Sequence, residues 1–135
     1  MHRGMRVINL IVVHCSATRA DRDFTEQDLE VCHRRRGMNG PGYHFYIRKN
    51  GDIKTTRPIE KIGAHARGYN AHSIGICYEG GISERGRPAD TRTVWQKHSL
   101  RVLVRMLLVD YPGCRVCGHR DLSPDLNGNG EIEPE

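Results

Sequence analysis

The chain has 135 residues, of which 37% are hydrophobic and 27% are charged, and its formal net charge is +5. This size and composition are typical of one globular domain that can bury a core without disulfide bonds. No run of about twenty apolar residues occurs, so we expect no membrane-spanning helix. The apolar run near the N-terminus is short and ends in a histidine, so it indicates a buried strand and not a signal peptide.

The first two predicted elements are a strand and a helix. Residues 6–14 form a β-branched apolar run that is typical of a central strand. The following helix is expected to begin after Thr25, an N-cap residue whose capping-box partner is Asp28. Gly37 can adopt the left-handed conformation that ends such a helix.

A β-hairpin and a second buried strand come next. Apolar and polar residues alternate through residues 43–48, and Asn50-Gly51 predicts a type I′ turn into a return strand. Residues 63–72 have the composition of a loop, and residues 73–80 form another apolar run. We therefore expect three strands between the first helix and the second.

The last predicted elements are a helix and a final strand. Thr93 and Gln96 form a capping-box pair, and Pro112-Gly113 marks the end of the helix. Four residues at helical spacing are predicted to form its apolar face: Leu100, Leu103, Met106 and Leu107. A strand from residue 114 then leads into the tail. The order β-α-β-β-β-α-β predicts an α/β fold, a single domain in which a mixed central β-sheet is flanked by helices.

The histidines carry the clearest chemical signal. His14 ends the first predicted strand and His119 ends the last one. Strand ends along one edge of a sheet are natural places for a shared site, and neutral imidazole is the commonest metal ligand. The residues alone leave two interpretations open, a metal-binding pair or two histidines that only form hydrogen bonds. His33 and His98 are expected to be surface or packing residues on helices, and His44 a hydrogen-bonded residue of the fold.

The sequence contains, in this order, the segments VVHCSAT, GYHFYIRKNGDI, GAHARGYNAHSIGICYEGG and GHRDLSPD. Together they resemble the phage-lysozyme-type N-acetylmuramoyl-L-alanine amidases, a family that includes the animal peptidoglycan recognition proteins. The resemblance implies a zinc-dependent enzyme that hydrolyses the amide bond between N-acetylmuramic acid and L-alanine in bacterial peptidoglycan. Peptidoglycan or a muropeptide would be its partner, and nucleic acid is not expected to be one.

The resemblance also implies roles for individual residues. His14 and His119 match the two histidines that bind zinc in the family, and Tyr43 matches a tyrosine beside the zinc. Tyr43 would donate a hydrogen bond to the oxyanion or orient the attacking water. The family's third ligand, usually a cysteine after the second histidine, has no match later in this sequence. Cys117 and Asp125 are the fallback candidates for that position, and a second copy of the chain or an extra water molecule is the third option.

The resemblance places two further residues near the substrate. His65 and Asn70 fall in a loop that lines the peptide-binding groove in relatives, which implies a substrate-binding role for both. A rigid turn built from Gly63, Gly68 and Asn70 is equally compatible with the sequence. Both interpretations of this loop are therefore carried forward.

A second partial motif lies in the tail. Asp125, Asn127 and Asn129 occupy the first ligand positions of an EF-hand loop, which predicts a calcium site, whereas a polar Gly/Asn turn is the alternative. The last, bidentate ligand of such a loop would fall beyond residue 135. Because the zinc motif also stops short, we expect residues 1–135 to be an amidase domain that lacks its C-terminal segment. A longer form would then supply the missing cysteine.

Two other functions stay open on the sequence. The missing third ligand favours a non-catalytic peptidoglycan-binding module, which would keep the binding surface without the metal. The basic charge favours, more weakly, a regulator of nucleic-acid enzymes. In the leading interpretation the chain is made in the cytoplasm without a signal peptide and acts at the bacterial cell wall after export or cell lysis.

Overall fold

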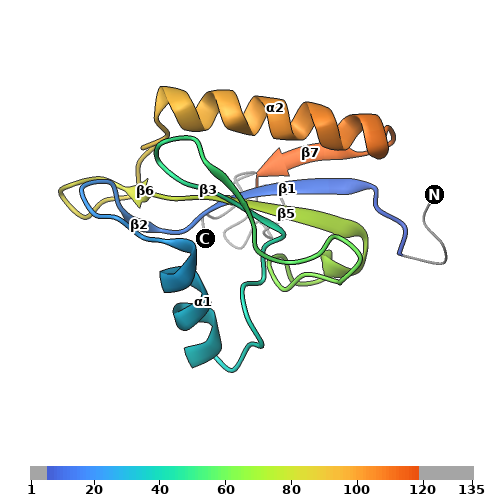
Figure 1. The fold of residues 1–135 in the computed structure, drawn as a ribbon, viewed down its shortest axis with the longest axis horizontal. Coiled ribbons are helices and arrows are strands. Elements are labelled where there is room, and N and C mark those ends of the chain that lie inside the picture. The colour runs from blue at the N-terminus through green and yellow to red at the C-terminus, as the bar shows by residue number, and fades with distance from the viewer. Residues whose placement is uncertain (1–5, 119–135) are drawn as a thin grey trace, which may run out of the picture.

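The structure, a computed structural model, describes residues 6–118. A five-stranded sheet has the strand order β4-β3-β5-β1-β7 (Figure 1). Its strands are β1 (Leu10–Cys15), β3 (Phe45–Ile47), β4 (Ile53–Thr55), β5 (Ser73–Tyr78) and β7 (Arg115–Gly118). The central strand β1 runs parallel to β5 and β7, and β3 runs parallel to β5 but antiparallel to β4. The sheet is therefore mixed, as predicted.

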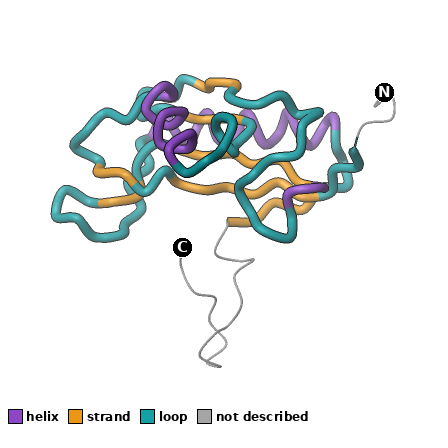
Figure 2. Tube along the Cα trace, turned by 90° about the horizontal axis from the view of Figure 1, so that it is seen from below, coloured by secondary structure: helices purple, strands orange, loops and turns teal. Residues whose placement is uncertain are grey.

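Two helices lie on opposite faces of this sheet (Figures 1 and 2). They are α1 (Glu26–Arg35) and α2 (Val94–Asp110), and a single 3₁₀ turn, η1 (Asn70–His72), precedes β5. Two short strands, β2 (Thr18–Arg19) and β6 (Gly81–Ile82), pair in parallel as a separate small sheet. Within the described residues, no helix combines the length and the apolar character needed to cross a bilayer. This arrangement confirms the predicted α/β class.

Alternation along the strands sends successive side chains to different faces. The core on the α2 side consists of Ile11, Ile47, Ile74, Ile76, Leu103 and Leu107. On the α1 side, Leu29 packs with Tyr46 and Cys77, and Phe24 and Tyr43 flank them. Both clusters are buried, so the sheet is covered on each side. Ile11 of β1 belongs to the core on the α2 side, so by alternation Val12 and His14 face α1. The site forms on this face.

Both helices begin as their capping residues predict. The Thr25 hydroxyl accepts a hydrogen bond from the Asp28 N–H at 3.0 Å, and the Asp28 carboxylate accepts one from the Thr25 N–H at 2.9 Å. Thr93 and Gln96 form the same reciprocal pair, at 3.1 and 2.9 Å. Gly37 follows α1 with a φ of +87°. These contacts confirm the predicted start of each helix and the end of the first.

The predicted type I′ turn is wrong. Within the described residues, Ala17 is the one non-glycine residue with a positive φ, so Asn50 does not have the conformation that this turn requires. Instead the Arg48 N–H donates to the Asp52 carbonyl at 2.9 Å, and the Gly51 N–H donates to the Arg48 carbonyl at 2.9 Å. Gly51 alone is left-handed, with a φ of +93°. The hairpin therefore has a three-residue loop.

Other differences concern element lengths and one side chain. β1 begins at Leu10 and not at residue 6, and β2 and β6 were not predicted because two residues show no periodicity. Met106 was predicted on the apolar face of α2 but is 62% exposed. Leu103 and Leu107 point into the core, and the 100° step between successive residues carries Met106 past the edge of that face.

Glu79, directly after β5, joins several segments. Its side chain is 1% exposed. One carboxylate oxygen accepts hydrogen bonds from Arg48 Nε at 2.7 Å and from the Lys49 N–H at 2.9 Å. The other accepts the Phe24 N–H at 2.6 Å, and Gln96 Nε2 donates to the Glu79 carbonyl at 2.8 Å. The hairpin, the entry to α1 and the start of α2 are thus held at one point.

Replacing Glu79 with alanine is expected to lower the free energy of unfolding by about 2 to 4 kcal/mol. The reason is that Arg48 and two backbone N–H groups would lose a buried acceptor. Urea unfolding at neutral pH measures the change. Glu84→Ala, the same substitution at an exposed position, should change stability by no more than about 0.5 kcal/mol. Equal effects of the two substitutions would contradict this role.

Candidate functional site

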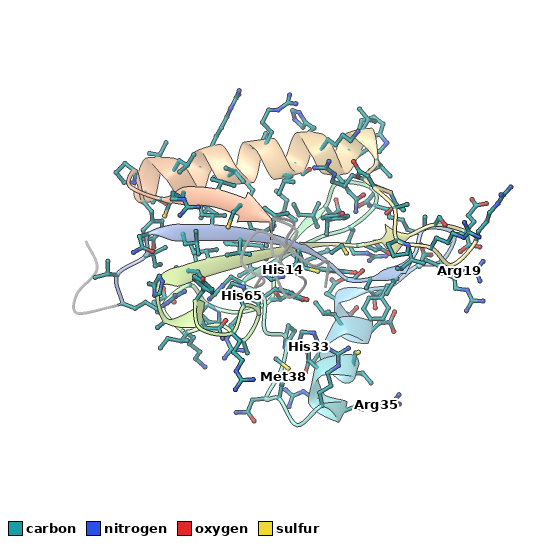
Figure 3. All side chains as sticks on the ribbon, turned by 180° about the vertical axis from the view of Figure 1, so that it is seen from behind. His14, Arg19, His33, Arg35, Met38 and His65 are labelled. Carbon is teal, nitrogen blue, oxygen red and sulfur yellow. The ribbon has the colours of Figure 1, made fainter. Side chains whose placement is uncertain are left out.

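His14 lies near the end of β1, on the face that α1 covers. It pairs in register with Cys77 of β5 and is 7% exposed. Its Nε2 atom is 2.9 Å from Nδ1 of His65, and the two rings meet edge to face with centroids 4.9 Å apart. Figure 3 shows the two histidines on the side of the sheet away from α2. The structure thus brings together two residues that are far apart in the sequence.

Asn70 fixes the loop that carries His65. Its side-chain oxygen accepts hydrogen bonds from the backbone N–H groups of His65 and Ala66, each at 2.9 Å. Amide side chains that accept from nearby backbone groups are typical of tight turns. This geometry supports the rigid-turn interpretation of the loop. The predicted substrate-binding roles of His65 and Asn70 stay predictions.

The His65 ring lies against the backbone of β5. A Cβ atom at Gly75 would lie 2.6 Å from the Cγ and Cδ2 atoms of this ring, and one at Gly63 would lie 2.6 Å from Cδ2. His65 Nε2 is 3.2 Å from the Ser73 hydroxyl. Only glycine leaves room for the ring to approach this closely. His14, His65 and Ser73 therefore form a continuous hydrogen-bonded row across the sheet.

Replacing Gly75 with alanine is expected to push the His65 ring away from His14. The added methyl group should also lower the free energy of unfolding by about 1 to 3 kcal/mol, the usual cost of overpacking. Thermal unfolding measures the second effect, and nuclear Overhauser contacts between the two rings measure the first. Gly113→Ala is the control, because a Cβ atom there would meet nothing within 4 Å. Unchanged ring contacts in Gly75→Ala would contradict the prediction.

Tyr43 stands between three histidine rings. Its ring centroid is 5.0 Å from that of His14, 5.4 Å from that of His33 and 6.4 Å from that of His65. Burial raises the pKa of its phenol well above the ordinary value, and the thiol of Cys77 raises it further. The hydroxyl therefore keeps its proton at neutral pH. It can donate a hydrogen bond but cannot serve as a general base.

Two neighbouring histidines have structural roles. His33 Nδ1 accepts the Gly42 N–H at 2.9 Å, and His44 Nδ1 accepts the Gly75 N–H at 3.0 Å. Burial lowers the pKa of His44 to about 4, so this ring is neutral and carries its proton on Nε2. That atom lies 2.8 Å from the Lys61 carbonyl. These contacts confirm the prediction that His33 and His44 serve the fold.

Sequence reasoning did not single out Ser73 or Gly75, whose importance follows from contacts with a distant loop. A glycine inside a strand, such as Gly75 in β5, is a general signal for close approach of another group to the backbone. Such a signal marks a position without naming the side chain that approaches it. The partner of Gly75, the ring of His65, is known from the structure alone.

The predicted metal ligands are only partly within the described residues. His14 is described, whereas His119, Asp125, Asn127 and Asn129 lie outside residues 6–118. Cys117 is on β7, in register with Val12. Among residues 6–118, no three side chains of histidine, cysteine, aspartate or glutamate come close enough to hold a metal ion. The third ligand and the calcium site therefore stay predictions.

Comparisons with known proteins agree with this geometry. The sequence profile of the family described as N-acetylmuramoyl-L-alanine amidase matches residues 4–131. An endolysin of Klebsiella phage KP32 is 39% identical over 114 residues, which cover 84% of this chain and 76% of the endolysin. The solved structure of the N-acetylmuramoyl-L-alanine amidase LysC from Clostridium intestinale has a TM-score of 0.74 at 35% identity, covering 94% of this chain and 79% of LysC.

A more distant solved structure has the same architecture. Drosophila PGRP-LB has a TM-score of 0.69 at 25% identity, and the match covers 89% of this chain and 73% of that protein. The chain belongs to the N-acetylmuramoyl-L-alanine amidase family. Its membership confirms the function predicted from the sequence, which is hydrolysis of the amide bond between N-acetylmuramic acid and L-alanine in peptidoglycan.

Proposed function

We propose that this chain performs the hydrolysis with a zinc ion held by His14 and His119, and with Tyr43 as a hydrogen-bond donor. The observation that carries the proposal is the parallel register of β1 and β7, in which Val13 pairs with Gly118. The next residues along the two strands are His14 and His119. Continuing the register by one step would put the two imidazoles side by side.

The contact between His14 and His65 supports a metal on the other ring nitrogen. Metal-binding histidines usually donate their second N–H to a neighbouring acceptor, which orients the ring. If His14 donates from Nε2 to Nδ1 of His65, its own Nδ1 carries the lone pair and would be the nitrogen that holds a zinc ion. His65 can then donate from Nε2 to the Ser73 hydroxyl. In this arrangement His65 is a positioning residue.

The donors fit zinc in type but not yet in number. Imidazole nitrogen suits zinc, and a catalytic zinc site has three protein ligands with one open position. Of the proposed zinc ligands, His14 lies within the described residues, and His65 contacts the His14 ring without being a proposed ligand itself. Cys117 and Asp125 stay the two candidates for the third ligand. Cys117 is in register with Val12, so its side chain shares the face of the sheet that His14 occupies.

The zinc ion, Tyr43 and His65 would have different roles in the hydrolysis. A zinc ion bound here would lower the pKa of a water molecule toward neutrality and polarise the amide carbonyl. Tyr43 keeps its proton, so its hydroxyl would donate a hydrogen bond to the carbonyl oxygen as negative charge develops there. His65 would hold the His14 ring in one orientation throughout. The reaction would take place at the bacterial cell wall.

Zinc content per chain tests the proposal directly. The 135-residue protein is dialysed against metal-free buffer, and its zinc is measured by elemental analysis while a muropeptide assay measures hydrolysis. We expect about one zinc per chain, as in catalytic sites that have three protein ligands and one open position, together with release of the stem peptide. Absence of both zinc and hydrolysis would refute the proposed site for this chain.

A non-catalytic peptidoglycan-binding module is the second candidate function. The sequence feature that favours it is the lack of a match, after His119, to the family's cysteine ligand. This function predicts that the chain binds muropeptide with a measurable heat in calorimetry but releases no stem peptide, with or without added zinc. Hydrolysis that starts when zinc is added would exclude it.

A further inference from the structure

The outer face of α2 is partly apolar. Trp95 is 63% exposed, Met106 is 62% exposed, Val109 is 81% exposed and Val102 is 37% exposed. These four residues are spaced by seven, four and three positions, so they form one stripe along the helix. Isolated apolar side chains on a surface need no explanation, but a continuous stripe on one helix indicates an interaction surface.

A row of positive charges runs beside this stripe. Lys97, Arg101 and Arg105 are each four residues apart and are all exposed. The one acidic residue in the sequence of α2 is Asp110, at its last position. We call the four apolar and three basic residues together the α2 outer face. Its apolar half and its cationic half both point to solvent.

The amidase site does not use this surface. His14 and His65 lie on the other side of the sheet, as Figure 3 shows. The inward side of α2 packs on the core through Leu103 and Leu107. Packing on the core therefore accounts for the apolar residues on the inner face of α2, but not for those on its outer face.

We propose that the α2 outer face binds the surface of an anionic lipid bilayer, with α2 lying parallel to the membrane plane. Interfacial helices combine an apolar stripe, often containing tryptophan, with lysine and arginine at the polar boundary. Basic residues next to an anionic leaflet are attracted to its phosphate groups. The stripe would enter the headgroup region, while Lys97, Arg101 and Arg105 would contact the phosphates.

Charge and chemistry favour lipid over two other partners. A second copy of the chain in a twofold contact would place Arg101 and Arg105 near the same residues of its partner, and like charges repel. Nucleic acid would be attracted by the basic row and could stack one base on Trp95, but the other three stripe residues, Val102, Met106 and Val109, are aliphatic and would stay exposed to water. An anionic bilayer satisfies both halves of the surface at once.

The proposal has a geometric consequence for the enzyme. With α2 on the membrane, the sheet lies between the bilayer and the site, and His14 faces away from the lipid (Figures 1 and 3). Peptidoglycan lies next to the bacterial membrane, so the site would be turned to the substrate. Binding of this kind would concentrate the enzyme where the wall is. The inference does not depend on zinc.

Trp95 makes the test direct, because it is the single tryptophan of the sequence. Its emission is recorded for the full chain with vesicles of phosphatidylglycerol and phosphatidylethanolamine, and with vesicles of phosphatidylcholine alone. We expect a blue shift and protection from acrylamide quenching with the anionic vesicles only. The response should decrease with added salt. No spectral change with anionic vesicles would overturn the proposal.

Variants separate the contributions of the two halves. Arg101→Glu with Arg105→Glu should weaken vesicle binding by about 25-fold or more, since each basic residue near an anionic surface contributes about fivefold. Met106→Gln with Val109→Gln should remove the blue shift. The matched control is Arg85→Glu with Arg87→Glu, the same charge reversal in an exposed loop. Equal weakening by the control would overturn the assignment to α2.

Two further outcomes would also overturn it. A blue shift of Trp95 that grows with protein concentration in the absence of vesicles would make the α2 outer face an interface between copies of the chain. Binding of duplex DNA that needs Arg101 and Arg105, without any response to vesicles, would make it a nucleic-acid surface. Circular dichroism and muropeptide hydrolysis verify that each variant is folded, because none of the substituted residues belongs to the core or the amidase site.

Discussion

Replacing His14 with alanine is expected to remove zinc from the chain and to lower amidase turnover by about 10³-fold or more, because the metal supplies several kcal/mol of transition-state stabilisation. His14 is buried and its Nε2 is 2.9 Å from His65. The substitution would remove one proposed zinc ligand and the donor that faces His65. Elemental analysis and a muropeptide assay measure the two effects on the same sample.

The fold should survive this substitution. His14 lies at the end of β1 and packs against Tyr43 and His65, outside the two apolar clusters that form the core. Thermal unfolding of the metal-free proteins therefore compares the variant with the parent chain. His98→Ala, at an exposed position on α2, should leave zinc content and turnover unchanged. A His14→Ala protein with full zinc content would remove His14 from the ligand set.

Replacing Tyr43 with phenylalanine is expected to lower kcat by about 10- to 1000-fold while zinc content stays the same. The substitution removes one hydroxyl and keeps the ring that contacts His14 and His33. Because the raised pKa keeps this hydroxyl protonated, its loss removes a hydrogen-bond donor and not a base. Steady-state kinetics with muropeptide separates the fall in kcat from any change in KM.

A matched substitution distinguishes chemistry from packing. Tyr69→Phe removes a hydroxyl from a tyrosine whose ring contacts His72, in the same loop as His65. It should leave kcat unchanged. If Tyr43→Phe lost zinc as well as activity, its hydroxyl would act through the metal site. If kcat did not fall, Tyr43 would have no part in the reaction.

Local patterns were enough to predict most of the fold. The capping pairs Thr25–Asp28 and Thr93–Gln96 involve residues three positions apart, and both form as predicted. Buried strands such as β1 and β5 show in the sequence as apolar runs. These features depend on neighbouring residues, so no knowledge of distant contacts is needed. The α/β class was predicted from the same local information, and the structure confirms it.

Features that depend on distant contacts could not be predicted in this way. The approach of His65 to His14 requires the loop before β5 to fold onto β1, which Gly75 permits and Asn70 stabilises. The exposure of Met106 depends on which side of α2 faces the sheet. Similarly, the hairpin loop is held by α2, because the hydroxyl groups of Thr93 and Ser99 donate hydrogen bonds to the carbonyl groups of Lys49 and Gly51.

Short spacings and motifs along the chain specify the order of elements, the two helix starts and the class of the enzyme. The pairing of His14 with His65, the raised pKa of Tyr43 and the two faces of α2 follow from the folded structure alone. The physical reason is that burial, pKa and close contact depend on atoms from segments far apart in the sequence, and those atoms meet only in the folded chain.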